Sequence, residues 1–228
     1  MTDIYASSFE STLTHVIITT VLCIFSDVDD INNLAVSMIR GPATHYYAVN
    51  EIVDDANAIL FPPEFLQTIT GTQLPPHDLQ LKVGAIVILI RGLNPAAGLC
   101  NGTRMQVLQH SPRMLQVRLL NGTHAGETAF LPRIDVHHKD ANLPFELMRR
   151  QFPVKLAFAM TINKSQSQSM ERVGIWLEDP VFGHGQLYVA LSRSCNPDHV
   201  CIHLGEVKNR QGNINGKWYT VNIVYHGL

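Results

Sequence analysis

An arginine at the end of a short apolar segment is the strongest candidate for chemistry in this sequence. The segment, residues 185–193, opens with a glycine and closes with Arg193. Its apolar residues follow the i, i+3, i+4 spacing of a buried helical stripe: Leu187, Ala190 and Leu191. Gln186 lies seven residues before Arg193, so on a helix the two side chains share a face. An arginine in this place can pair with a carboxylate, remain in solvent or bind a phosphate, and the segment by itself leaves all three open.

A second segment, residues 151–169, changes from apolar to polar within a few residues. It begins with an apolar stretch of strand length and ends in small or polar residues: Asn163, Lys164, Ser165, Gln166, Ser167, Gln168 and Ser169. A buried strand that runs into a hydroxyl-rich turn is how α/β folds build a ligand-binding edge at the carboxyl ends of their strands. The alternative is an ordinary strand-to-helix loop with a serine cap.

Charge is distributed unevenly along the chain although the formal net charge is only -2. Residues 1–81 contain ten acidic residues and one basic residue, whereas residues 82–164 contain eleven basic and four acidic residues. A local basic surplus of this size predicts a nucleic-acid surface, with a solvated basic face as the alternative. The candidates for contacts to a phosphate backbone are Lys82, Arg91, Arg104, Arg133, Arg149 and Arg150.

The four cysteines do not form a Cys-x-x-Cys pair, so neither a redox motif nor a zinc ribbon is indicated. One cluster of possible metal ligands occurs near the end of the chain: Cys195, His199, Cys201 and His203. On a strand the last three would share a face. Their spacing fits no common zinc pattern, so we expect no metal site and treat the cluster as a strand with polar ends.

The first eighty residues predict α/β elements. We expect a strand at 16–25, a helix at 27–40 capped by Ser26, a short strand near 46–49 and a short helix at 64–69. From Leu81 several short β-runs follow, separated by turn signals such as Asn121-Gly122: 85–90, 104–109, 115–120, 128–131 and 134–137. This pattern predicts a small β-barrel. A strand of parallel-sheet type is expected again from Val154.

The chain thus divides into an α/β part at 1–80, a small β-barrel at 81–140, a return to the α/β part at 141–205 and a tail at 206–228. The longest apolar runs are too short to span a bilayer, and the start has no basic stretch before a hydrophobic one. We therefore expect no membrane association and no secretory signal, and an intracellular protein, nuclear in a eukaryote.

Further stretches between about residues 58 and 204 accompany the two segments: Leu81-Lys82-Val83-Gly84-Ala85, Gly98 to Arg104, Leu131-Pro132-Arg133-Ile134, Leu143-Pro144-Phe145, Arg149 to Pro153, and His184. In this order they resemble the carboxyl-terminal half of DNA helicases of the PIF and RecD type, and most of all the helicase of Helitron transposons. Residues 151–169 resemble motif V of this family and residues 185–193 resemble motif VI. The resemblance implies an α/β fold, with a RecA-like parallel sheet as the second helicase lobe and a small β-barrel insertion.

The resemblance also implies roles for individual residues. Arg193 stands at the position of the arginine finger, which stabilises charge developing on the γ-phosphate. The DNA side of motif V would be Thr161, Asn163, Lys164 and Ser165, and the nucleotide side would be Gln166, Ser167 and Ser169, with Gln186 beside Arg193. Ser167 departs from the family's usual glycine and Ser169 from its usual threonine. The first change puts close backbone approach to a phosphate in doubt, and the second keeps the hydroxyl.

The first lobe of such a helicase is not encoded in these residues. The sequence has no Gly-x-x-x-x-Gly-Lys-Ser/Thr phosphate loop. ATP and magnesium are therefore expected as cofactors only where another chain or missing segment supplies that lobe, and the expected partners are this lobe and single-stranded DNA. The alternative is a non-catalytic nucleic-acid or protein interaction module derived from a transposon helicase.

Overall fold

The computed structural model describes residues 19–23, 28–53, 61–166, 168–204, 212–214 and 217–224, with only the backbone described at 19–23, 214 and 218. The chain divides into two compact units. Residues 36–157 form one unit, and the segments on either side of it, 1–35 and 158–228, together form the other. We call them the antiparallel unit and the parallel unit after their main sheets. The described part is mixed α/β and rich in strands, and four of its five sheets are antiparallel.

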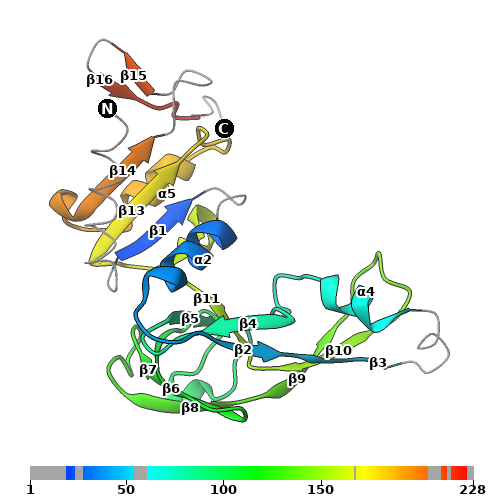
Figure 1. Ribbon diagram of the computed structural model, residues 1–228. Helices are drawn as coiled ribbons and strands as arrows, with labels where there is room; N and C mark the ends of the chain where they lie inside the picture. Colours follow the sequence, from blue (N-terminus) through cyan, green and yellow to red (C-terminus); the bar gives the residue numbers. More distant parts are fainter. Residues whose placement is uncertain are drawn as a thin grey trace. The chain divides into compact units, whose positions relative to one another are not determined.

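The parallel unit contains a four-stranded sheet in the order β12-β1-β13-β14, in which all neighbours run parallel (Figure 1). Its strands are β1 (Thr19–Cys23), β12 (Ala159–Thr161), β13 (Arg172–Leu177) and β14 (Val200–Leu204). Because β1 pairs with both β12 and β13, residues near the start of the chain lie between strands from its last third. The strand predicted at 16–25 is confirmed for 19–23.

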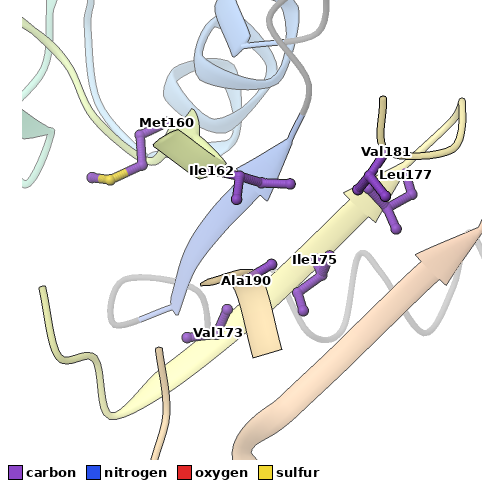
Figure 2. Close-up of a cluster of buried hydrophobic side chains, with 7 residues drawn as sticks. All are labelled: Met160, Ile162, Val173, Ile175, Leu177, Val181 and Ala190. Atoms are coloured by element: carbon purple, nitrogen blue, oxygen red, sulfur yellow. The ribbon is translucent and has the colours of Figure 1, made fainter. Parts of the chain in front are cut away.

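Alternating apolar residues build the core of the parallel unit. Every second residue of β13 is buried, as expected for a strand with one face on a core: Val173, Ile175 and Leu177. They form one cluster with four further side chains, drawn in Figure 2: Met160, Ile162, Val181 and Ala190. The hydrophobic effect of this shared burial holds the surrounding elements against the sheet.

Helix α5 (Gln186–Leu191) contributes Ala190 to this cluster, and Leu187 packs against it. Leu191 is 41% exposed, so its predicted burial is wrong. The helix has only six residues and ends at Leu191, so its last residue has no further turn that would hold it over the sheet.

Helix α2 (Val28–Met38) confirms the helix predicted at 27–40. Asp29 and Asp30 lie in its first turn, where the helix dipole favours negative charge. The predicted cap, Ser26, lies outside the described residues. Ile31 packs against Ala159 of β12, so the helix covers the start of that strand.

The antiparallel unit contains a five-stranded sheet in the order β11-β5-β6-β7-β8. Its strands are β5 (Ile86–Leu89), β6 (Arg104–His110), β7 (Met114–Leu119), β8 (Thr128–Pro132) and β11 (Val154–Leu156). A second sheet has the order β3-β10-β9, and β2 pairs with β4. Their bounds are β2 (Thr44–Tyr47), β3 (Val49–Ile52), β4 (Asp78–Leu81), β9 (Ile134–His138) and β10 (Leu147–Gln151).

The short β-runs predicted between residues 85 and 137 are all strands of this unit. The short helix predicted at 64–69 is α4 (Pro63–Thr68), whose Leu66 packs in a cluster with Leu74, Val136, Phe145 and Leu147. The unit extends beyond the predicted 81–140 at both ends, because β2, β3 and β10 pair within it.

One prediction about strand direction is wrong. Val154 begins β11, which pairs antiparallel with β5, whereas parallel pairing starts only at β12. A short apolar run is compatible with either kind of sheet, since strand direction depends on which distant strand it meets. The apolar stretch at 151–162 is therefore the link by which the chain leaves one unit and enters the other.

The remaining elements are short. They are the 3-10 helices η2 (Pro95–Ala97), η3 (Ile162–Ser165) and η4 (Pro197–His199), and the hairpin of β15 (Gly212–Ile214) and β16 (Lys217–Tyr219). None of the helices in the described residues is long and apolar enough to pass through a bilayer.

Candidate nucleotide and nucleic-acid site

The turn after β12 displays two of the residues predicted to face DNA. Thr161 caps η3 because its Oγ1 accepts a hydrogen bond from the backbone N–H of Lys164, 3.3 Å away. Asn163 and Lys164 are exposed at this turn, which follows the carboxyl end of a parallel strand. An exposed amide and an exposed ammonium at such an edge can bind the oxygens of a phosphate.

Ser165 does not belong to this exposed set. Its side chain is fully buried, and its Oγ donates a hydrogen bond to the carbonyl oxygen of Ile162 at 2.6 Å. The prediction that Ser165 contacts DNA is therefore corrected, because the hydroxyl is enclosed and stabilises the turn from within. Its carbonyl oxygen has a different partner, Arg193.

Arg193 lies two residues beyond α5 and joins the two candidate segments. Its Nη1 donates to the carbonyl oxygens of Ser165, at 3.2 Å, and Gln168, at 3.1 Å. Its Nε donates to the carbonyl oxygen of Val189 and its Nη2 to Oγ of Ser192, both at 2.8 Å. Within the described residues it has no salt bridge to a carboxylate, so the ion-pair alternative does not describe this arginine.

Gln186 and Arg193 have different hydrogen-bond partners, and α5 ends at Leu191, two residues before Arg193. The side chain of Gln186 is buried, and its Oε1 accepts hydrogen bonds from the backbone N–H groups of Phe182, at 3.2 Å, and Gly183, at 3.1 Å. The described contacts of Gln186 thus position the loop that leads into α5.

The other residues predicted to lie near a nucleotide are less constrained. Gln166 and Ser169 are exposed, and Ser167 lies outside the described residues. Gln168 was not among the predicted site residues. It nevertheless makes one hydrogen bond within the turn and another to Arg193. Its Nε2 donates to the carbonyl oxygen of Lys164 at 3.1 Å, while its own carbonyl oxygen accepts from Arg193. The local sequence contains no signal that distinguishes Gln168 from the neighbouring polar residues.

Arg149 was predicted to contact DNA, and the structure contradicts this. Its side chain is 1% exposed. The guanidinium donates to Oδ1 of Asn50 and to the carbonyl oxygens of Leu66, Ile69 and Pro75 at 2.6 to 3.0 Å. Burial lowers the pKa of Arg149 to about 10, which still leaves it charged at neutral pH. It ties α4 and the following loop to β10, and no phosphate can reach it.

Lys82 and Arg104 also use their charge inside the protein. The Nζ of Lys82 donates to the carbonyl oxygens of Ser37 and Ile39, where a cation stabilises the end of a helix. The Nη2 of Arg104 donates to the carbonyl oxygen of Ala157 at 3.2 Å, and burial lowers the pKa of Arg104 to about 10. Arg104 was predicted to contact DNA, but its half-buried side chain is poorly placed to reach a DNA strand in solvent.

Arg133 and Arg150, by contrast, line a surface hollow of about 410 Å³ together with Arg113 and Pro132. Arg113 was not predicted to contact DNA. It lies between β6 and β7, and the sequence signal that could have found it is the local charge surplus to which it belongs. The hollow lies in the antiparallel unit and the Arg193 turn lies in the parallel unit.

The histidines and cysteines near β14 do not converge on an ion. No group of three His, Cys, Asp or Glu side chains in the described parts of the chain is arranged to hold a metal. His203 stacks on Trp176 with ring centroids 3.8 Å apart, and Nδ1 of His199 lies 3.0 Å from the carbonyl oxygen of Glu171.

Comparisons with known proteins define the class and then the family. A family model described as the 2B domain of the DNA helicase Pif1 matches residues 64–110. The ATP-dependent DNA helicase PIF1 of Danio rerio is 35% identical over 182 residues, which is 78% of this chain and 26% of that protein. These matches place the chain among proteins related to DNA helicases.

Solved structures agree with this class. The structure of Bacteroides Pif1 bound to ssDNA matches 81% of this chain and 40% of its own, with a TM-score of 0.61 and 26% identity. The Bacteroides protein in complex with ADP-AlF3 and ssDNA matches with a TM-score of 0.59 at 25% identity. The chain is thus a partial chain of the Pif1 family of DNA helicases and contains the 2B domain of that family. It spans about a fifth to a quarter of the length of the curated relatives it matches.

Proposed function

We propose that this chain supplies the second lobe and the 2B domain of an ATP-dependent DNA helicase. In this proposal the four-stranded parallel sheet is the RecA-like lobe, and the sheets of the antiparallel unit are the β-barrel inserted into it. The order of the strands supports this, because β1 precedes the antiparallel unit in the chain and lies between β12 and β13, which follow it. An insertion into a pre-existing parallel sheet accounts for that arrangement.

The observation that carries the proposal is the contact between Arg193 and the turn after β12. In a helicase the second lobe must couple a phosphate-sensing arginine to the segment that touches DNA. Here one guanidinium group donates to the carbonyl oxygens of Ser165 and Gln168, directly behind the exposed Asn163 and Lys164. A shift of Arg193 towards a nucleotide would remove these two bonds and so change the turn.

Arg193 has five N–H donors, and four of them are used locally. A phosphate from a first lobe could bind the remaining donor at Nη2 directly, and further donors if the bonds to the turn are released. This gives the arginine two states, one bound to the turn and one bound to phosphate. ATP and magnesium would then be held mainly by the first lobe, which this chain does not contain.

The DNA side of the proposal rests on Thr161, Asn163 and Lys164. The Bacteroides relative was solved with ssDNA, and we propose the same partner for this chain. Because bound phosphates release counterions, binding should weaken as salt rises. We further propose that the protein acts inside the cell, and in the nucleus of a eukaryote.

The test is to mix the full chain with the first lobe of a Pif1 relative and to measure ATP hydrolysis with and without ssDNA. We expect DNA-stimulated hydrolysis that falls by on the order of 10³ in Arg193→Ala. Arg172→Ala is the matched control, because it removes an exposed arginine from the same unit. Hydrolysis that survives Arg193→Ala would contradict the role of this residue.

A second function, a non-catalytic nucleic-acid binding module, is favoured by one observation. Most donors of Arg193 are already satisfied within the chain, so the turn is stable without a nucleotide. Binding of ssDNA by the chain, together with no hydrolysis in the mixture, would establish this function in place of the first.

A further inference from the structure

Three arginines converge where the two larger sheets of the antiparallel unit join. Arg133 is the single residue between β8 and β9, which belong to different sheets. Pro132 pairs with Met114, the first residue of β7, so the end of β8 lies close to Arg113, which directly precedes β7. Arg150 pairs with Asp135 across β9 and β10. Strand pairing therefore brings three arginines that are far apart in the sequence to one hollow.

Arg133 is held rigidly in this place. Its Nη1 donates to the carbonyl oxygen of Tyr47 at 2.9 Å. Its guanidinium carbon lies 5.5 Å from the ring centroid of Tyr46 and 5.1 Å from that of Phe152, within the range of cation–π attraction. The Nε of Arg133 is buried and has no hydrogen-bond partner among the described residues. The group is thus preorganised, and because its Nε is enclosed, a ligand in the hollow would meet the Nη groups.

Arg113 and Arg150 are both exposed and line the same hollow. The one salt bridge that the described residues form with the three arginines joins Oδ1 of Asp135 to Nη1 of Arg150, 3.8 Å apart. This pair is largely solvated, with side-chain exposures of 61% for Arg150 and 43% for Asp135, so it is weak and readily exchanged. The described surroundings of the hollow leave a surplus of positive charge.

We propose that this hollow binds a backbone phosphate of nucleic acid, with Arg113, Arg133 and Arg150 as its ligands. This inference rests on the proposed nucleic-acid partner and adds a second contact site, in a different unit from the turn at Asn163 and Lys164. Guanidinium groups match phosphate because their planar N–H donors bind two oxygens at once. The volume of about 410 Å³ is sufficient for a phosphodiester and its adjoining sugar.

The test is fluorescence anisotropy of a labelled thymidine oligonucleotide with the full chain over a range of salt concentrations. The double variant Arg113→Ala with Arg150→Ala should bind more weakly, and its salt slope should fall by roughly 0.7 for each phosphate that the protein no longer neutralises. The matched control is Arg40→Ala with Arg118→Ala, which removes two exposed arginines of the same unit that do not line the hollow. Because all four side chains are exposed, thermal unfolding should be alike in the two double variants.

Equal loss of affinity and of salt slope in the two double variants would overturn the site in favour of a diffuse basic face. A polyglutamate of matched charge that competes as well as the oligonucleotide would overturn it in favour of an acidic protein partner. Failure here is distinguishable from failure of the proposed function. If the hollow has no role, hydrolysis with a first lobe would still depend on Arg193, and if the motor assignment fails, the Arg113 and Arg150 effect on binding would remain.

Discussion

At the scale of single residues, Arg149 is a buried cation that donates four hydrogen bonds, all to uncharged oxygens. The bond to Oδ1 of Asn50 also orients that amide, because an arginine can only donate. The amide nitrogen of Asn50 therefore donates to Nδ1 of His77, 3.1 Å away. Burial and the charge of Arg149 lower the pKa of His77, which keeps its Nδ1 able to accept.

We expect Arg149→Met to destabilise the antiparallel unit by at least about 3 kcal/mol, because buried carbonyl oxygens left without a donor cost roughly 1–3 kcal/mol each. Urea unfolding, with hydrogen exchange of the β10 amides, measures this loss. Arg150→Met is the matched control, since it removes an exposed arginine from the next position and should change stability by less than about 0.5 kcal/mol. Equal effects of the two substitutions would contradict the role given to Arg149.

The sequence contains a signal that separates these two arginines. Side chains alternate along β10, so Arg149 shares a face with Leu147 and Gln151, both fully buried, whereas Arg150 points the other way. The charge surplus alone, without this alternation, makes both residues appear equivalent. Arg133 was among the predicted DNA contacts, but its convergence with Arg113 on one hollow was harder to foresee, because the hollow depends on pairing between distant strands.

At the scale of elements, local signals predicted most strands and the three α-helices of the described residues, since turn residues and apolar spacing act over a few positions. Strand direction and the limits of the insertion depend on which strands meet, and short runs do not encode that. The turn after β12 was predicted as a polar edge, and it is one. Its stabilisation by Arg193 and by the buried Ser165 depends on tertiary contacts that polarity alone does not reveal.

Asn32 shows how one side chain connects two elements. It is buried on α2, and its amide both donates to the carbonyl oxygen and accepts from the N–H of Ala159, at 3.2 and 2.9 Å. β12 is an edge strand, so the Asn32 amide replaces the neighbouring strand that Ala159 lacks on that side.

We expect Asn32→Ala to destabilise the parallel unit by about 2 kcal/mol, because two buried backbone groups lose their partner. Hydrogen exchange at the Ala159 amide should accelerate accordingly. Asn33→Ala on the same helix is the control, since Asn33 is exposed. Equal exchange rates of the Ala159 amide in Asn32→Ala and in this control would contradict the role of the Asn32 side chain as a substitute for a neighbouring strand.

At the scale of the whole molecule, the chain leaves the parallel unit after residue 35 and returns to it at residue 158. The direct hydrogen bonds between Asn32 and Ala159 place the exit and the re-entry close together. A unit whose ends are neighbours can be inserted into another fold without disturbing it. This geometry explains how β1 can pair with strands that follow the antiparallel unit in the sequence.

The same geometry predicts that residues 36–157 fold when expressed alone. Their sheets pair among themselves, and their apolar cluster around Leu66, Phe145 and Leu147 is drawn from their own residues. A dispersed amide NMR spectrum of this fragment, lost in its Arg149→Met variant and kept in Arg150→Met, is the expected result. A disordered fragment would contradict this prediction. It would show that the core of residues 36–157 is not sufficient for folding and that the parallel unit is needed.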